Sequence, residues 1–133
     1  MNVPFPIRTE CPPGACICDR ERLLATPDGD IRILRLTREE EKKLVARLEN
    51  LASLSDLRHM QERMHALLGI SLTVTPGPNE VRTVRGLHIE IADQPGLCNK
   101  TRQTLPAAIR RGLERNPAIV YELLNSHDLL GGI

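Results

Sequence analysis

The strongest constraint on the fold comes from residues 37–69, where apolar residues repeat at the spacing of two consecutive α-helices. Thr37 followed by Glu40 forms a capping box, which predicts a helix over residues 37–52. Ser53 or Ser55 would cap a second helix that ends at Gly69. Because the link is short, we expect an antiparallel helical hairpin. Its buried positions would be Leu44, Leu48, Met60 and Met64.

Four β-strands are predicted, arranged as two hairpins. The turn sequence of residues 26–30, Thr-Pro-Asp-Gly-Asp, separates candidate strands at 22–25 and 31–36. Apolar and polar residues alternate over residues 70–75 and again over residues 87–91, on either side of a segment that begins Pro-Gly-Pro-Asn. We therefore expect a second antiparallel hairpin there.

The C-terminal part of the chain is predicted to be helical. Thr104 would cap a third helix with Pro106 near its first turn, and Asn116-Pro117 would separate it from a fourth. The predicted order is β-β-α-α-β-β-α-α. Strands in hairpins and helices in pairs favour an α+β fold over a wound parallel sheet. We expect a single domain over residues 21–133, preceded by an N-terminal arm of residues 1–20.

Composition narrows the classes of function. A chain of 133 residues is the size of one domain, and with one Phe, one Tyr and no Trp its core must be aliphatic. Scarce aromatic residues also count against a surface that stacks on nucleic-acid bases. The net charge of +1 gives no overall attraction to nucleic acid or to an anionic membrane. No apolar run reaches about 18 residues and no secretory signal is seen, so we expect a cytoplasmic protein.

The four cysteines are the main functional signal. Without an export signal they are expected to be thiols or metal ligands rather than disulfides. Cys11, Cys16 and Cys18 lie in the run Cys-Pro-Pro-Gly-Ala-Cys-Ile-Cys, where Pro13-Gly14 suits a type II turn. The Pro-Gly-x-Cys pattern recurs at residues 95–98 and ends in Cys98. We therefore predict that these four cysteines ligate one metal centre.

Four thiolates suit tetrahedral Zn²⁺ or an iron–sulfur cluster. The spacing matches neither common pattern, since zinc sites usually show a cysteine pair in both halves. The run C-x₄-C-x-C is one residue shorter than the plant-type ferredoxin run. In one alternative, Cys16 and Cys98 are small buried apolar residues and the other two are incidental. A thiol enzyme that uses Cys16 or Cys18 ranks last, because no base lies nearby in the sequence.

The second candidate site is basic. Residues 100–115 hold five basic residues against one acidic residue, a local charge of +4. Helix N-terminal amides could assist these side chains in binding phosphate. The same pattern is more often the solvated side of an amphipathic helix. The candidate anion-binding residues are Arg102, Arg110, Arg111 and Arg115.

The remaining polar clusters favour structural explanations. His88 and Glu90 are expected on the solvated face of a strand, and residues 125–128, Asn-Ser-His-Asp, at a helix end. Gly112 within the third helix indicates close packing. The leading hypothesis is a small intracellular metalloprotein with a structural or regulatory, non-enzymatic role. The alternative is a metal-free binding module whose basic helix meets an anionic partner such as nucleic acid.

Overall fold

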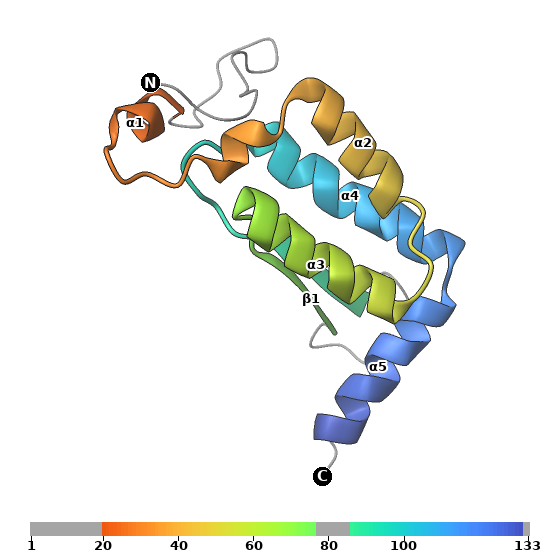
Figure 1. Cartoon of the computed structure of the whole chain (residues 1–133). Helices are drawn as coiled ribbons and strands as arrows, with labels where there is room; N and C mark the ends of the chain where they lie inside the picture. The colour runs from red at the N-terminus through yellow and green to blue at the C-terminus, as the bar shows by residue number, and fades with distance from the viewer. Residues whose placement is uncertain (1–19, 77–85, 132–133) are drawn as a thin grey trace.

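The computed structural model describes residues 20–76 and 86–131, and these residues are mostly helical (Figure 1). They form five α-helices, one 3₁₀ helix and two strands. In chain order the elements are α1 (Arg20–Ala25), η1 (Arg32–Arg35), α2 (Arg38–Leu48), α3 (Leu54–Leu68), β1 (Leu72–Pro76), β2 (Leu87–Ile91), α4 (Asn99–Arg115) and α5 (Ala118–Gly131).

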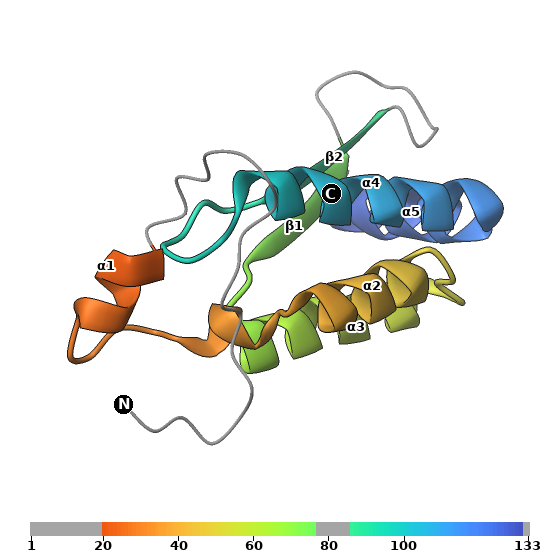
Figure 2. The same cartoon turned by 90° about the horizontal axis from the view of Figure 1, so that it is seen from above.

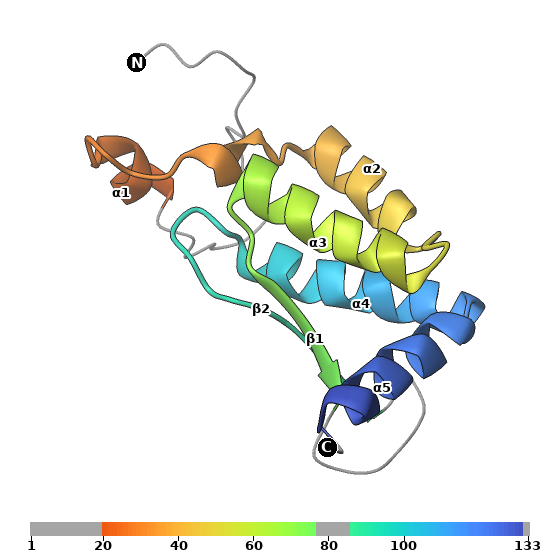
Figure 3. The ribbon, with the colours of Figure 1, turned by 60° about the horizontal axis from the view of Figure 1, so that its bottom comes forward.

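The elements form two layers, which are clearest when the molecule is seen from above (Figure 2). One layer contains α2 and α3, and the other contains the hairpin of β1 and β2 with α4 and α5. The layers meet where α2 packs against α4 and where α3 packs against β1 and α5. The short helix α1 lies at one end of the molecule, beyond η1 (Figure 3).

The two predicted helices of residues 37–69 are present, and their caps are the expected ones. The Thr37 hydroxyl accepts a hydrogen bond from the Glu40 backbone N–H at 3.3 Å, and Gly69 ends α3 with a left-handed φ of 72°. Ser53, rather than Ser55, caps α3 by accepting from the Asp56 N–H at 3.1 Å. The first helix ends at Leu48, four residues earlier than predicted, since a turn starts at Glu49.

The predicted α+β fold with four strands in two hairpins is wrong, because its first hairpin does not exist. Residues 20–25 form α1, and residues 32–35 form the 3₁₀ helix η1. Ile33 and Leu34 are adjacent and both fully buried, whereas neighbouring residues of a strand point to opposite faces. The tight turn of η1 buries both side chains on one side of the chain. The turn at residues 26–29 remains, with the Gly29 N–H donating to the Thr26 carbonyl.

The second predicted hairpin is confirmed as an antiparallel pair of strands. Val74 lies opposite Ile89 in a regular register that runs from Leu72–Ile91 to Pro76–Leu87. Along β2 the apolar side chains are buried and the polar ones are exposed, as the sequence alternation predicted.

The start of the third predicted helix is wrong by six residues. Helix α4 begins at Asn99, with Cys98 in the N-cap position, so Thr104 does not cap it and Pro106 lies inside it. An internal proline removes one helical hydrogen bond. Buried residues before and after the proline, including Thr101, Leu105 and Ile109, favour a continuous helix against the core.

The core is aliphatic, as the composition required. Leu48, Met60 and Met64 are buried as predicted, but Leu44 is only half-buried. Tyr121 keeps 53% of its surface exposed on α5. The largest side chains with almost no exposure are Ile33, Leu34, Leu48, Leu57, Met64, Ile70, Leu105, Ile109, Leu113, Ile119 and Cys98.

Candidate functional site

The turn that precedes Cys98 has the geometry that its sequence predicts. The Leu97 N–H donates to the Gln94 carbonyl at 3.2 Å, and Gly96 has a φ of 87°. Proline at the second position and a glycine of positive φ at the third are typical of a type II turn. Of the two Pro-Gly-x-Cys segments, this is the one that lies within the described residues.

This turn packs directly against the N-terminal elements. A Cβ atom at Gly96 would lie 2.7 Å from Ile33 Cγ2 of η1 and 2.8 Å from Leu23 Cδ2 of α1. A side chain on residue 96 would therefore require the side chains of Ile33 and Leu23 to shift. The chain segment that leads to Cys98 thus touches α1, although 74 residues separate Leu23 from Leu97 in the sequence.

Cys98 itself is buried, with 1% of its surface exposed, at the N-cap of the 17-residue helix α4. A helix N-terminus stabilises negative charge, and thiolate is the form of cysteine that binds metals. The other three predicted ligands, Cys11, Cys16 and Cys18, lie outside the described residues. Within residues 20–76 and 86–131, no three His, Cys, Asp or Glu side chains are grouped to hold a metal ion.

The arginines at the C-terminal end of α4 contact protein groups. Arg111 donates from Nε to a Glu49 carboxylate oxygen at 2.5 Å, and Arg115 donates to the Glu49 backbone carbonyl at 3.3 Å. Both contacts join α4 to the turn between α2 and α3. Next to them, the Asn116 side-chain amide donates to the Ala52 carbonyl at 3.0 Å.

The other two predicted anion-binding residues lie apart from this contact. Arg102, near the start of α4, is 3.3 Å from an Asp93 carboxylate oxygen and donates to the Asn99 side chain at 3.2 Å. Arg110 is half-buried and makes no ion pair with another described residue. The four arginines are thus distributed along α4, and three of them already bind acidic, amide or carbonyl oxygens of the protein.

His88 and Glu90 lie on the exposed face of β2, as predicted, with 2.9 Å between His88 Nε2 and a Glu90 carboxylate oxygen. Across the strands, His88 pairs with Thr75 and Glu90 pairs with Thr73. The exposed face of this hairpin is therefore polar, which fits a solvated sheet face.

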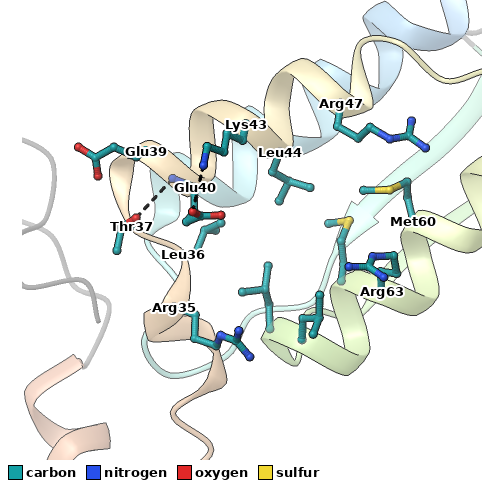
Figure 4. A pocket seen from close by; sticks show the side chains of 13 residues that line it. Arg35, Leu36, Thr37, Glu39, Glu40, Lys43, Leu44, Arg47, Met60 and Arg63 are labelled. Atoms are coloured by element: carbon teal, nitrogen blue, oxygen red, sulfur yellow. Dashed lines mark hydrogen bonds and ion pairs between the residues drawn. The ribbon is translucent and has the colours of Figure 1, made fainter. Parts of the chain in front are cut away.

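A concave surface that the sequence analysis did not predict lies between α2 and α3 (Figure 4). This α2–α3 groove has a volume of about 710 Å³ and opens beside η1. Leu44 of α2 and Met60 and Arg63 of α3 point into it (Figure 4). Its apolar lining residues are Leu36, Leu44, Met60, Met64, Leu67 and Leu68.

A signal for the groove was present in the width of the apolar stripe on α3. A helix that buries one face needs about three apolar positions in every two turns, but α3 adds Leu67 and Leu68 beside Met60 and Met64. Leu67 remains 40% exposed, so the stripe extends beyond the core. The predicted antiparallel packing of the two helices made these residues look like core residues.

No protein-family model matches this sequence, and no significant match to a known protein or to a solved structure was found. In the described segments, no helix combines the length and apolar character that a membrane span requires. The function is therefore inferred from the chemistry of the residues themselves.

Proposed function

We propose that this chain is a metal-binding protein in which Cys11, Cys16, Cys18 and Cys98 ligate Zn²⁺ or an iron–sulfur cluster. The role would be structural or regulatory. One observation carries the proposal: the turn before Cys98 packs against α1, the element that directly follows the N-terminal cysteines. A site shared by the two cysteine segments would need a contact of this kind.

The length of the chain fits this arrangement. Cys18 is two residues before Arg20, where α1 begins, and a two-residue connection spans at most about 7 Å. Leu23, which contacts the Cys98 turn, is five residues after Cys18 and so no more than about 18 Å away along an extended chain. A site shared by Cys18 and Cys98 is thus within reach.

The chemistry of Cys98 is suited to this role. Its side chain is buried at the N-cap of α4, where burial disfavours an unbound thiolate and the helix dipole would favour one that is bound to a metal cation. When bound, the metal would tie the N-terminal arm to the start of α4. For a structural zinc site, the free energy of metal binding would contribute to folding.

The test is metal content per chain, measured by mass spectrometry on full-length protein purified anaerobically and reduced. We expect metal in the wild type, and we expect Cys98→Ser to lose it about as completely as Cys16→Ser, since each replaces a thiolate with a hydroxyl. Visible absorption would identify an iron–sulfur cluster, whereas a zinc protein would be colourless.

Thr101→Ser is the matched control, because Thr101 is buried one helical turn beyond Cys98 and is not a proposed ligand. It should retain full metal content. A wild-type protein without metal would refute the proposal. Full retention of metal in Cys98→Ser, together with loss in Cys16→Ser, would show a site made of the local thiols alone.

A further inference from the structure

We propose that the α2–α3 groove binds an amphipathic helix of another protein, with acidic residues flanking the apolar face of that helix. This site is separate from the proposed cysteine centre. The proposal rests on the way the two helices are packed, on the apolar floor of the groove and on the charge of its rim.

The packing of α2 and α3 leaves the groove open. Helix α2 makes its main contacts with α4, and α3 makes its main contacts with η1, β1 and α5. Each helix therefore buries the side that faces the second layer, and the sides that face each other are only partly covered. Leu44 is half-buried as a result, and Leu67 is 40% exposed.

The floor of the groove suits an apolar helix face. Its volume is about 710 Å³, and six apolar residues line it. Met60 and Met64 form part of its lining. These two side chains are buried, and the apolar surface that a bound helix would cover comes from Leu67, which is 40% exposed, and from the half-buried Leu44 and Leu68.

The rim of the groove is mainly basic, which selects an acidic partner. Four basic residues and two acidic residues line it: Arg35, Lys43, Arg47, Arg63, Glu39 and Glu40. Lys43 lies 3.6 Å from Glu40, and Arg47 pairs with Asp56. Arg63 makes no ion pair with another described residue, and its side chain points into the groove (Figure 4). A carboxylate beside the apolar face of a bound helix would pair with Arg63 while that face covers the apolar floor of the groove.

The experiment uses two synthetic amphipathic peptides of about 18 residues, long enough for five helical turns. They share the same leucines, but one carries glutamates beside its apolar face and the other carries lysines. Binding to the full chain is measured by fluorescence anisotropy at low and high salt. We expect the acidic peptide to bind at least about tenfold more tightly than the basic one, and salt to reduce this preference.

Two variants locate the binding site. Arg63→Glu should remove the preference for the acidic peptide or reverse it, and Leu67→Ala should weaken binding of the acidic peptide. Arg58→Glu is the matched control, since Arg58 is exposed on the same helix but does not line the groove. It changes the net charge equally and should leave binding unchanged. Circular dichroism confirms that each variant is folded.

Three results would overturn the proposal. The first is equal binding, or no binding, of the two peptides. The second is an equal loss of binding in Arg58→Glu and Arg63→Glu, which would indicate a general charge effect. The third is a dimer of the wild-type chain, seen by sedimentation without peptide and abolished by Leu67→Ala. A dimer of that kind would make a second copy of the chain the occupant of the groove.

Discussion

At the scale of single residues, Asp56 in the first turn of α3 makes several polar contacts with the end of α2 and the turn that follows it. Its carboxylate accepts hydrogen bonds from both terminal nitrogens of Arg47 and from the Ala52 backbone N–H. The hydrogen bonds from Arg47 lower the pKa of Asp56 below its ordinary value of 3.8, and they outweigh the partial burial that acts to raise it. This carboxylate therefore joins the end of α2 to the start of α3.

Replacing Asp56 with Asn should make the stability of the fold less dependent on pH. Because the pKa is lower in the folded state, the carboxylate stabilises the fold above the unfolded-state pKa and loses this effect as pH falls through the folded-state pKa. We expect Asp56→Asn to cost about 1 kcal/mol near pH 7, since the Arg47 side chain is 43% exposed and solvent screens the ion pair. Urea unfolding between pH 7 and pH 3 measures the difference.

The difference in free energy of unfolding between Asp56→Asn and wild type should stay constant down to about pH 5 and shrink below about pH 4. Glu62→Gln is the control, because Glu62 is exposed on the same helix and has no ion pair with another described residue. It should change stability very little. A difference for Asp56→Asn that is the same at all pH values would contradict the assigned role of the carboxylate.

At the scale of elements, the contact between α2 and α4 depends on Gly112. A Cβ atom at this position would lie 2.2 Å from the Leu48 backbone carbonyl oxygen, which is too close for two non-bonded atoms. The close packing that the sequence indicated at this glycine is confirmed. The absence of a side chain allows α4 to lie directly against the last turn of α2.

Gly112→Ala should destabilise the protein, although alanine is the better helix former by about 1 kcal/mol. The obstructing atom belongs to the backbone, so the two helices must move apart. We expect a loss of about 1–3 kcal/mol in the free energy of unfolding. Gln103→Ala, at an exposed position of the same helix, should stay within about 0.5 kcal/mol of wild type. A stabilising effect of Gly112→Ala in urea unfolding would refute the close contact.

Leu44 and Leu48 of α2 should differ in how much they contribute to the free energy of unfolding. Leu48 is fully buried, so Leu48→Ala should cost about 2–5 kcal/mol. Leu44 faces the groove and is only half-buried, so Leu44→Ala should cost clearly less. Thermal and urea unfolding of the two variants test this ranking. Equal costs would mean that the groove closes around Leu44 in solution.

Elements set by local interactions could be predicted from the sequence. The cap at Thr37, the helix end at Gly69 and the turn at Gly96 each depend on residues only a few positions apart. The region of α1 and η1 was mispredicted because its turn sequence is equally compatible with a hairpin. Burial of the adjacent Ile33 and Leu34 against distant elements decides the outcome, and no local pattern specifies it.

At the scale of the whole molecule, polar contacts join the two layers where their turns meet. Glu49 in the α2–α3 turn binds Arg111, and Asn116 binds the Ala52 carbonyl, across 62 and 64 positions of sequence. The sequence showed the positive charge of this end of α4 but not its partners. For the cysteine site, it predicted the turn before Cys98, whereas the contact of that turn with α1 required the folded chain.

The aliphatic core has a consequence for spectroscopy. The chain has no Trp, and its single Tyr projects from α5 with 53% of its surface exposed. Its near-ultraviolet absorption and intrinsic fluorescence are therefore weak, and they report little on the interior. This low background would make charge-transfer bands of the proposed thiolate–metal centre easy to detect. One tryptophan placed in the α2–α3 groove would likewise be the dominant fluorophore of the protein, and its emission would report directly on whatever fills that groove.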